Sequence, residues 1–437
     1  MRKTRQVLEM LRDYESRNVT FLDPDGTWPI VWERARGVHV WDAEGKKYLD
    51  LTAAFGVAAA GHANPRVVRA GQKQMAKLLH AMGDVHPHAL KAQLARELSR
   101  LTFERWAGTR GKVIFNNSGF EAVEAALKTA MLATGRRGII AFEGAYHGLG
   151  YGVLNATHRE HFRGPFRSQL REFGHFVPFP VAAGVRRLES KSKSNEPPHV
   201  GCYEVERRIR QIFRREKIGA ILVEPIQARG GCNVPPPEFL PMLRKLCDEC
   251  GALLILDEIY TGFGRTGKWF AAEHSRVIPD LICLGKALTG GFPLSACVGR
   301  ADVMDAAWPV SQGEAIHTST FLGHPVGCAM ALAQMGEIRR LKLVERSAKL
   351  GTFLRAELAK IRNSVRGRGL MVGLELARDD GAAATAESLK AIKAMLHRGF
   401  ILLPEGEFGN VISFTPPLTI SEAQLKQSVA ALAEVLR

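Results

Sequence analysis

The amino-acid sequence predicts an α/β fold built on a mostly parallel sheet. Two short apolar runs, Leu253–Leu256 and Leu281–Leu284, each end beside a charged residue and a glycine-containing turn. Runs of this length, bounded by turn signals, are typical of strands buried on both faces of a parallel sheet. Similar runs at 112–115, 138–142 and 219–223 alternate with helical patterns. The charged residues after such strands therefore gather at the carboxyl edge of the sheet, where open α/β sheets bind ligands.

Composition excludes several functional classes. The chain has 437 residues, of which 46% are hydrophobic, and this is enough for two or three domains. The net charge is +16, but the basic residues are spread over many predicted helices, which favours a solvated surface over a nucleic-acid site. No apolar run is long enough to span a membrane, and the basic start is not followed by a signal core, so we expect a cytoplasmic protein without a membrane partner.

The cysteines indicate neither disulfides nor a metal site. There are seven, an odd number, scattered along the sequence, and this pattern favours free thiols. Cys247 and Cys250 form a lone CxxC, for which the sequence offers no further ligands. We interpret them as thiols on a helix and expect no metal.

The sequence divides into an N-terminal segment at 1–65, a large domain at 66–325 and a smaller C-terminal α+β domain at 326–437. The N-terminal segment contains a predicted helix, a loop at 23–26 and antiparallel strands that are expected to join the small domain. A polar surface loop is expected at 184–200. The last segment contains predicted helices and strands at 327–335, 341–361, 370–375 and 411–414.

Three residues stand out for their chemistry. A lysine at a strand end, such as Lys286, is costly to bury unless it is paired, deprotonated or covalently engaged. Its alternative role is a salt bridge to a carboxylate at another strand end, and Asp257 could be such an ordinary carboxylate. Ser118 begins a predicted helix directly after a strand, which suits phosphate binding. A simple N-cap uses the same geometry and is the alternative.

Six motifs follow one another in an informative order. They are Asn117–Ala122, Tyr146–Gly148, Glu224–Pro225, Asp257–Glu258 with Gly262–Gly267, Gly285–Lys286 and Ser319–Phe321. From about Pro29 to the C-terminus, the series resembles the class III aminotransferases, which are pyridoxal-phosphate enzymes of fold type I. The resemblance implies a large domain with a seven-stranded, mostly parallel sheet flanked by helices. It also implies a smaller α+β domain formed by the N- and C-terminal segments.

The resemblance implies pyridoxal 5'-phosphate as the cofactor. Lys286 is then the residue that forms an imine with the cofactor aldehyde and moves a proton, and Asp257 pairs with the ring nitrogen. His147 is expected to orient or pack, and Thr320 to reach the cofactor of the neighbouring subunit, which implies a homodimer, although a tetramer is also compatible. The expected cofactor contacts are Ser118, Gly119, Phe120, Tyr146, His147, Glu224, Asp257, Ile259, Lys286 and Thr320.

Two departures from the family pattern affect the substrate. Many members have an arginine before Pro-Pro-Leu and a glutamate after the Glu-Pro strand, where this sequence has Ser413 and Arg229. We expect Arg229 to bind the carboxylate of a keto acid and Ser413 to leave room for amines without an α-carboxylate. Phe55 is a candidate pocket wall, with core packing as the alternative. Glu405 is a candidate contact for a cationic substrate arm, although a solvated loop is the more common situation.

The predicted function is an aminotransferase that moves an amino group from a primary amine or ω-amino compound to pyruvate or 2-oxoglutarate by a ping-pong mechanism. An aminomutase, or an amino-acid racemase or epimerase on the same scaffold, is the alternative. A non-enzymatic basic binding protein or regulator is disfavoured, because the residues before the family-like region leave no room for an added DNA-binding module.

Overall fold

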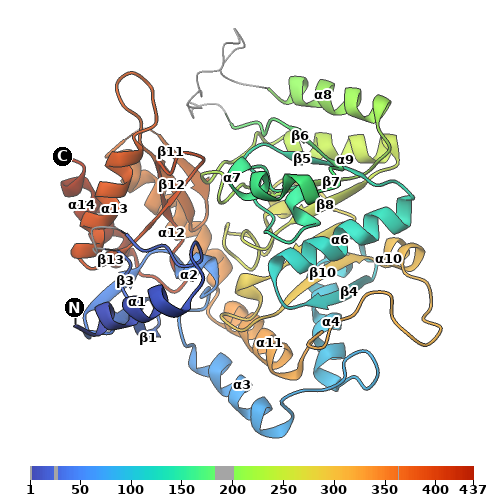
Figure 1. Ribbon diagram of the computed structural model, residues 1–437, viewed down its shortest axis with the longest axis horizontal. Coiled ribbons are helices and arrows are strands. Elements are labelled where there is room, and N and C mark those ends of the chain that lie inside the picture. Colours follow the sequence, from blue (N-terminus) through green and yellow to red (C-terminus); the bar gives the residue numbers. More distant parts are fainter. Residues whose placement is uncertain (1, 24–27, 183–200, 363) are drawn as a thin grey trace.

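The computed structural model describes residues 2–23, 28–182, 201–362 and 364–437. These residues form a large α/β part and a smaller α+β part that lie side by side, with both chain ends on the smaller part (Figure 1). Most of the predicted loop at 23–26 and all of the predicted polar loop at 184–200 lie outside the described residues.

A seven-stranded sheet forms the centre of the large part, in the order β4-β10-β9-β8-β7-β5-β6. Strands β6, β5, β7, β8 and β9 run parallel, and β10 is antiparallel to both of its neighbours. The strands are β4 (Gly111–Asn116), β5 (Gly138–Phe142), β6 (Gly174–Val177), β7 (Ile218–Val223), β8 (Leu253–Asp257), β9 (Leu281–Leu284) and β10 (Ser295–Arg300). The expected fold class is thereby confirmed.

Helices cover both faces of this sheet because successive strand residues point to opposite sides. On one face, Ile221 of β7 shares a core with Leu243 of α9, and on the other, Leu222 shares a core with Ala126 of α6. The helices of this part are α3 (Pro65–Lys77), α4 (Ala89–Leu101), α5 (Phe103–Ala107), α6 (Gly119–Thr134), α7 (Glu160–Arg163), α8 (Cys202–Arg215), α9 (Phe239–Cys250), α10 (Ala301–Ala307) and α11 (Pro325–Arg340).

The smaller part joins the two ends of the chain. Strand β3 pairs in parallel with β13, and the Leu49 amide donates a hydrogen bond to the Gly399 carbonyl at 2.8 Å. Its two four-stranded sheets have the orders β1-β2-β3-β13 and β11-β12-β15-β14. The elements are α1 (Arg2–Tyr14), β1 (Trp32–Arg36), β2 (His39–Asp42), β3 (Lys47–Asp50), α2 (Ala53–Gly56), α12 (Leu343–Ala359), β11 (Val365–Arg368), β12 (Met371–Glu375), α13 (Thr385–His397), β13 (Phe400–Ile401), β14 (Leu403–Glu405), β15 (Val411–Phe414) and α14 (Glu422–Val435).

A buried arginine fastens the two parts together. The Arg265 guanidinium donates to the carbonyls of Leu370 and Pro416, at 2.9 and 2.6 Å. Burial lowers the pKa of Arg265 to about 10. The two donated bonds offset part of its desolvation. Within the described ranges, no helix combines the length and apolar character needed to cross a membrane.

Candidate active site

A cavity of about 360 Å³ lies where several strands of the central sheet end. Asp257 is the last residue of β8, Glu224 follows β7, and Lys286 stands two residues after β9. Because these three strands are adjacent and parallel, their carboxyl ends bring the three side chains together. The cavity is lined by Gly119, Phe120, Tyr146, His147, Gly148, Leu149, Glu224, Ala228, Arg229, Asp257, Ile259, Tyr260 and Lys286.

Lys286 lines this cavity without an ion pair. Its Nζ lies 3.8 Å from the centroid of the Tyr260 ring, and no carboxylate of the described residues lies within salt-bridge distance of it, so the salt-bridge alternative is not supported. Desolvation lowers the pKa of Lys286 to about 8, against the opposing attraction of nearby carboxylates. Its φ of 42° is in the left-handed region. Such backbone strain costs roughly 1–3 kcal/mol and is concentrated at functional sites.

Asp257 is held in place by two contacts. Its Oδ2 lies 2.7 Å from Nδ1 of His147, and its Oδ1 accepts a hydrogen bond from the Ile259 amide at 3.0 Å. His147 is buried, and its Nε2 has no hydrogen-bond partner among the described residues. The geometry therefore gives His147 an orienting contact with Asp257, whose carboxylate lines the cavity as a fixed site for positive charge.

Glu224 connects two turns around the cavity. One carboxylate oxygen accepts from the Tyr146 amide at 3.1 Å, and the other accepts from the Ala228 amide at 3.0 Å. Burial, with a smaller contribution from the charge of Asp257, raises the pKa of Glu224 to about 7. The buried carboxylate thus fixes the aromatic turn relative to the turn that carries Arg229.

The turn before α6 has the geometry of an N-cap. The Ser118 hydroxyl donates to Oε2 of Glu121 at 2.8 Å, and the amides of Asn117 and Ser118 donate to the same oxygen at 3.1 and 2.6 Å. A Cβ at Gly119 would lie 3.1 Å from the Ile259 side chain, so glycine permits this close approach. The helix N-terminus that results is suited to an anion.

Several predicted site residues do not line the cavity. Phe55 is 49% exposed on a left-handed turn, so the core-packing alternative is wrong. Thr320 is exposed between α10 and α11, and Ser118 only flanks the lining. Ser413 is buried on β15, and its hydroxyl lies 3.7 Å from Sγ of Cys232.

Glu405 is only 5% exposed on β14, so the interpretation as a solvated loop residue is wrong. Its Oε2 lies 3.8 Å from Nε of Arg229, and neither atom has a hydrogen-bond partner within the described part of the chain. The Arg229 guanidinium carbon lies 5.3 Å from the Tyr146 ring centroid. Burial raises the pKa of Glu405, and the charge of Arg229 opposes this shift. Two opposite charges, separated by more than a hydrogen-bond distance, thus stand at one edge of the cavity.

Four residues of the lining were not among the predicted site residues: Gly148, Leu149, Ala228 and Tyr260. Tyr260 follows Asp257 by three positions, and its hydroxyl lies 3.1 Å from Oγ1 of Thr415. Its proximity to the Asp257–Glu258 motif was the feature of the sequence that could have identified Tyr260 as a lining residue. Leu149 directly follows the Tyr146–Gly148 motif, but an isolated leucine carries no chemical signal.

The donor set fits pyridoxal phosphate. An amine, a carboxylate, an aromatic face and an anion site are present, from Lys286, Asp257, Tyr146 and the α6 N-terminus, and these are the groups that such a cofactor requires. A Cβ at Gly148 would lie 2.3 Å from Cβ of Phe120, so glycine also permits the close packing of this wall.

Comparisons with known proteins agree with the site. The family described as aminotransferase class-III matches residues 22–436. The 5-aminovalerate aminotransferase DavT of Pseudomonas aeruginosa is 37% identical over 93% of each chain, and an acetylornithine aminotransferase of Methanopyrus kandleri is 37% identical over 94% of this chain and 95% of its own. An amine transaminase structure from an uncultivated Pseudomonas species, in its PLP-bound form, has a TM-score of 0.85 and 28% identity, covering 97% of this chain and 98% of that one. The chain therefore belongs to the class III aminotransferases, the pyridoxal-phosphate-dependent enzymes that transfer amino groups.

Proposed function

We propose that this enzyme transfers the amino group of a primary amine or ω-amino compound to a keto acid such as pyruvate or 2-oxoglutarate, with Arg229 as the carboxylate contact. The carrying observation is the position of Arg229, which lines the cavity together with Lys286 and lies opposite Glu405. A guanidinium binds carboxylates with two parallel hydrogen bonds. The names of the relatives, which act on 5-aminovalerate and acetylornithine, support an ω-amino donor.

The side chains of the cavity have separate roles in the proposed reaction. Bound pyridoxal phosphate supplies an aldehyde that takes up amino groups and a ring that withdraws electrons. With a pKa of about 8, roughly one in ten Lys286 amines is neutral at pH 7, so Nζ can accept and return a proton. The Asp257 carboxylate stabilises positive charge on the ring, and His147 holds this carboxylate in position. Ser118, Gly119 and Phe120 would hold the phosphate, and Tyr146 and Ile259 would contact the ring.

The proposed substrate contacts account for the remaining residues. Glu405 faces a cationic arm of the donor, and Phe55 forms an outer wall of the substrate pocket. Ser413 stands where many family members have an arginine, and its smaller side chain leaves room for amines without an α-carboxylate.

The spectrum of the purified holoenzyme tests the overall reaction. An amine added without keto acid should discharge the visible band of the bound cofactor, and pyruvate or 2-oxoglutarate should restore it. A band that no amine discharges would contradict the proposed donors, and a discharged band that neither keto acid restores would contradict the proposed acceptors.

Replacing Arg229 by alanine should raise the KM for the keto acid by about 10- to 100-fold, because hydrogen bonds to charged groups contribute roughly 1.5–3 kcal/mol. The half-reaction with a primary amine that carries no carboxylate is the internal control and should change little. Stopped-flow measurement of each half-reaction separates the two effects. An unchanged KM for both pyruvate and 2-oxoglutarate would show that Arg229 does not bind the keto-acid carboxylate.

We also propose a cytoplasmic homodimer in which Thr320 completes the cofactor site of the neighbouring subunit. The seven cysteines are free thiols, as reducing compartments favour. Thr320 is exposed, and nearby Ile316 and Phe321 are 68% and 57% exposed. Large exposed apolar side chains of this kind are typical of interaction surfaces.

Mixing two impaired variants tests the shared site. Thr320→Ala should weaken cofactor binding, and Lys286→Met should abolish turnover. After mixing and subunit exchange, a heterodimer contains one site with both an intact lysine and an intact partner threonine. Activity should therefore rise well above the sum of the separate variants. No gain, despite subunit exchange shown by native mass spectrometry, would mean that Thr320 does not act across the interface.

A further inference from the structure

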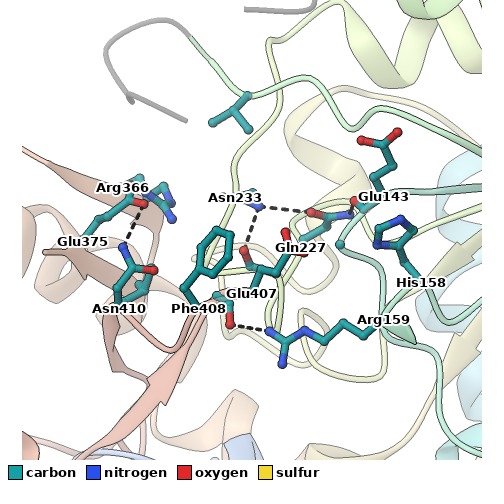
Figure 2. Close-up of a pocket in the computed structure, with 15 residues that line it drawn as sticks. Glu143, His158, Arg159, Gln227, Asn233, Arg366, Glu375, Glu407, Phe408 and Asn410 are labelled. Carbon is teal, nitrogen blue, oxygen red and sulfur yellow. Dashed lines mark hydrogen bonds and ion pairs between the residues drawn. The ribbon is translucent and has the colours of Figure 1, made fainter. Parts of the chain in front are cut away.

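A second arginine, Arg159, contacts the backbone of Arg229. It precedes α7, and one of its guanidinium nitrogens, Nη2, donates hydrogen bonds to two carbonyls. One is the carbonyl of Arg229, at 2.9 Å, and the other is that of Gly406 in the smaller part of the molecule. Figure 2 shows Arg159 extending from the large part toward the segment that carries Glu407 and Phe408. A single side chain thus bridges the two parts beside the active site.

The backbone around this arginine closes a small ring of hydrogen bonds. The Gly406 amide donates to the Arg229 carbonyl at 3.1 Å, the same oxygen that accepts from Arg159. Gly406 has a φ of 86°, a conformation that favours glycine. A Cβ on Gly231 would lie 3.3 Å from Cα of Gly406, so the two turns are in close contact. Arg159 therefore fastens the turn after β7 to the turn after β14.

These two turns carry the charges at the cavity edge. Arg229 belongs to the first turn, and Glu405 immediately precedes Gly406 in the second. The 3.8 Å separation of their Nε and Oε2 atoms is longer than a hydrogen bond. Glu405 is buried, whereas the Arg229 side chain is 32% exposed. Because each side chain is anchored in its own turn, the separation of the two charges depends on how firmly the backbones of the two turns are held together.

Arg159 also acts on this pair through its charge. Burial raises the pKa of Glu405, and the charges of Arg229, Lys286 and Arg159 oppose that shift. Removing the Arg159 guanidinium would thus favour protonation of Glu405 and weaken its contact with a cationic group. The geometric and electrostatic effects of Arg159 both converge on the Arg229–Glu405 pair.

We propose that Arg159 is a positioning residue that determines substrate specificity by setting the spacing of Arg229 and Glu405 across the two parts of the molecule. It does this without contacting the reacting atoms. The inference rests on the proposed role of Arg229 in acceptor binding. It assigns a function to a residue outside the catalytic cavity and predicts that discrimination between substrates with and without a carboxylate depends on it.

The test compares Arg159→Gln and Arg159→Lys with Arg167→Gln in the cofactor-loaded enzyme. Arg167 lies in the same segment but pairs with Glu160 on the surface, at 2.6 Å, which makes it a matched control for loss of charge. Arg159→Gln should raise the keto-acid KM about tenfold, since small misplacements of binding groups are costly. It should leave the half-reaction with a monoamine that carries no carboxylate within about twofold. Arg159→Lys should be intermediate, because an ammonium can donate to both carbonyls. The control should leave the keto-acid KM unchanged.

Two further measurements separate the possible outcomes. Hydrogen–deuterium exchange should show faster exchange of the Gly406 amide in Arg159→Gln, by about tenfold, and no change in the control. In an Arg229→Ala background, Arg159→Gln should add nothing to the keto-acid KM but should still accelerate the exchange. If Arg229→Ala raises the keto-acid KM and Arg159→Gln does not, the role of Arg159 is refuted, whereas the proposed contact of Arg229 with the keto-acid carboxylate is supported. If Arg229→Ala itself leaves the keto-acid KM unchanged, both the Arg229 contact and this inference are refuted.

Discussion

Replacing Lys286 by methionine should lower the rate of transamination by about 10⁴-fold or more, because both the nucleophilic amine and the proton carrier are lost. Methionine is one atom shorter than lysine but is unbranched and fills most of the same space beside the Tyr260 ring, which lies 3.8 Å from Nζ of Lys286. The variant should therefore fold and retain the cavity. Single-turnover kinetics with an amine donor and a keto acid measure the loss.

Lys91→Met provides the matched control. Lys91 is also partly buried, but its amine donates to the Gly83 carbonyl outside the cavity. Treatment of the holoenzyme with borohydride should add the cofactor mass to the peptide that contains residue 286 in the wild-type and Lys91→Met proteins, and not in Lys286→Met. Covalent attachment at any other lysine in Lys286→Met with near-normal turnover would refute the assignment.

The pH dependence of cofactor capture follows from the same residue. Burial lowers the pKa of Lys286 to about 8, below the usual value near 10.4, and only the neutral amine attacks an aldehyde. The rate at which the apoenzyme captures pyridoxal phosphate should therefore increase with pH and level off above about 8. A midpoint near 10 would mean that the amine is not desolvated in solution.

The sequence predicted those parts of the site that depend on local patterns. Lys286 and Asp257 follow apolar strands, and the parallel arrangement of those strands brings their ends together. Strand β10 was not predicted, because Ser295–Arg300 contains small residues and glycine that give a weak strand signal. It nevertheless pairs along its whole length with β4 and over 296–299 with β9, so tertiary pairing outweighs its local propensity.

The remaining site features depend on contacts between distant segments. Glu405 has the local pattern of a loop residue near glycines, and its burial arises only when the smaller part packs beside Arg229. Arg159 is one of many basic residues in the sequence, and nothing near it distinguishes it from the others. Its significance comes from carbonyls that lie 70 and 247 positions away. Such roles require the assembled fold.

Replacing Asp257 by asparagine should reduce kcat by about 10³-fold, in the range for removing one preorganised electrostatic group. The shape of the side chain is preserved, but the negative charge that stabilises a protonated ring nitrogen is lost. The His147 contact is the second reason: with Nδ1 2.7 Å from the carboxylate, the imidazole orients a charged partner better than a neutral amide. Removing that contact alone, in His147→Phe, should have a smaller effect, because the carboxylate charge remains.

The decisive control for Asp257→Asn is Asp280→Asn. Asp280 is also a buried carboxylate of the central sheet, but it precedes β9, at the amino end of that strand, and pairs with Arg244 and Arg300 at 2.7 and 3.0 Å. Its substitution should lower the thermal stability by breaking a buried charge network and leave kcat nearly unchanged. Asp257→Asn should show the reverse pattern. If both variants lost stability and neither lost kcat, Asp257 would be a structural carboxylate, and the chemistry would lie away from the carboxyl edge of the sheet.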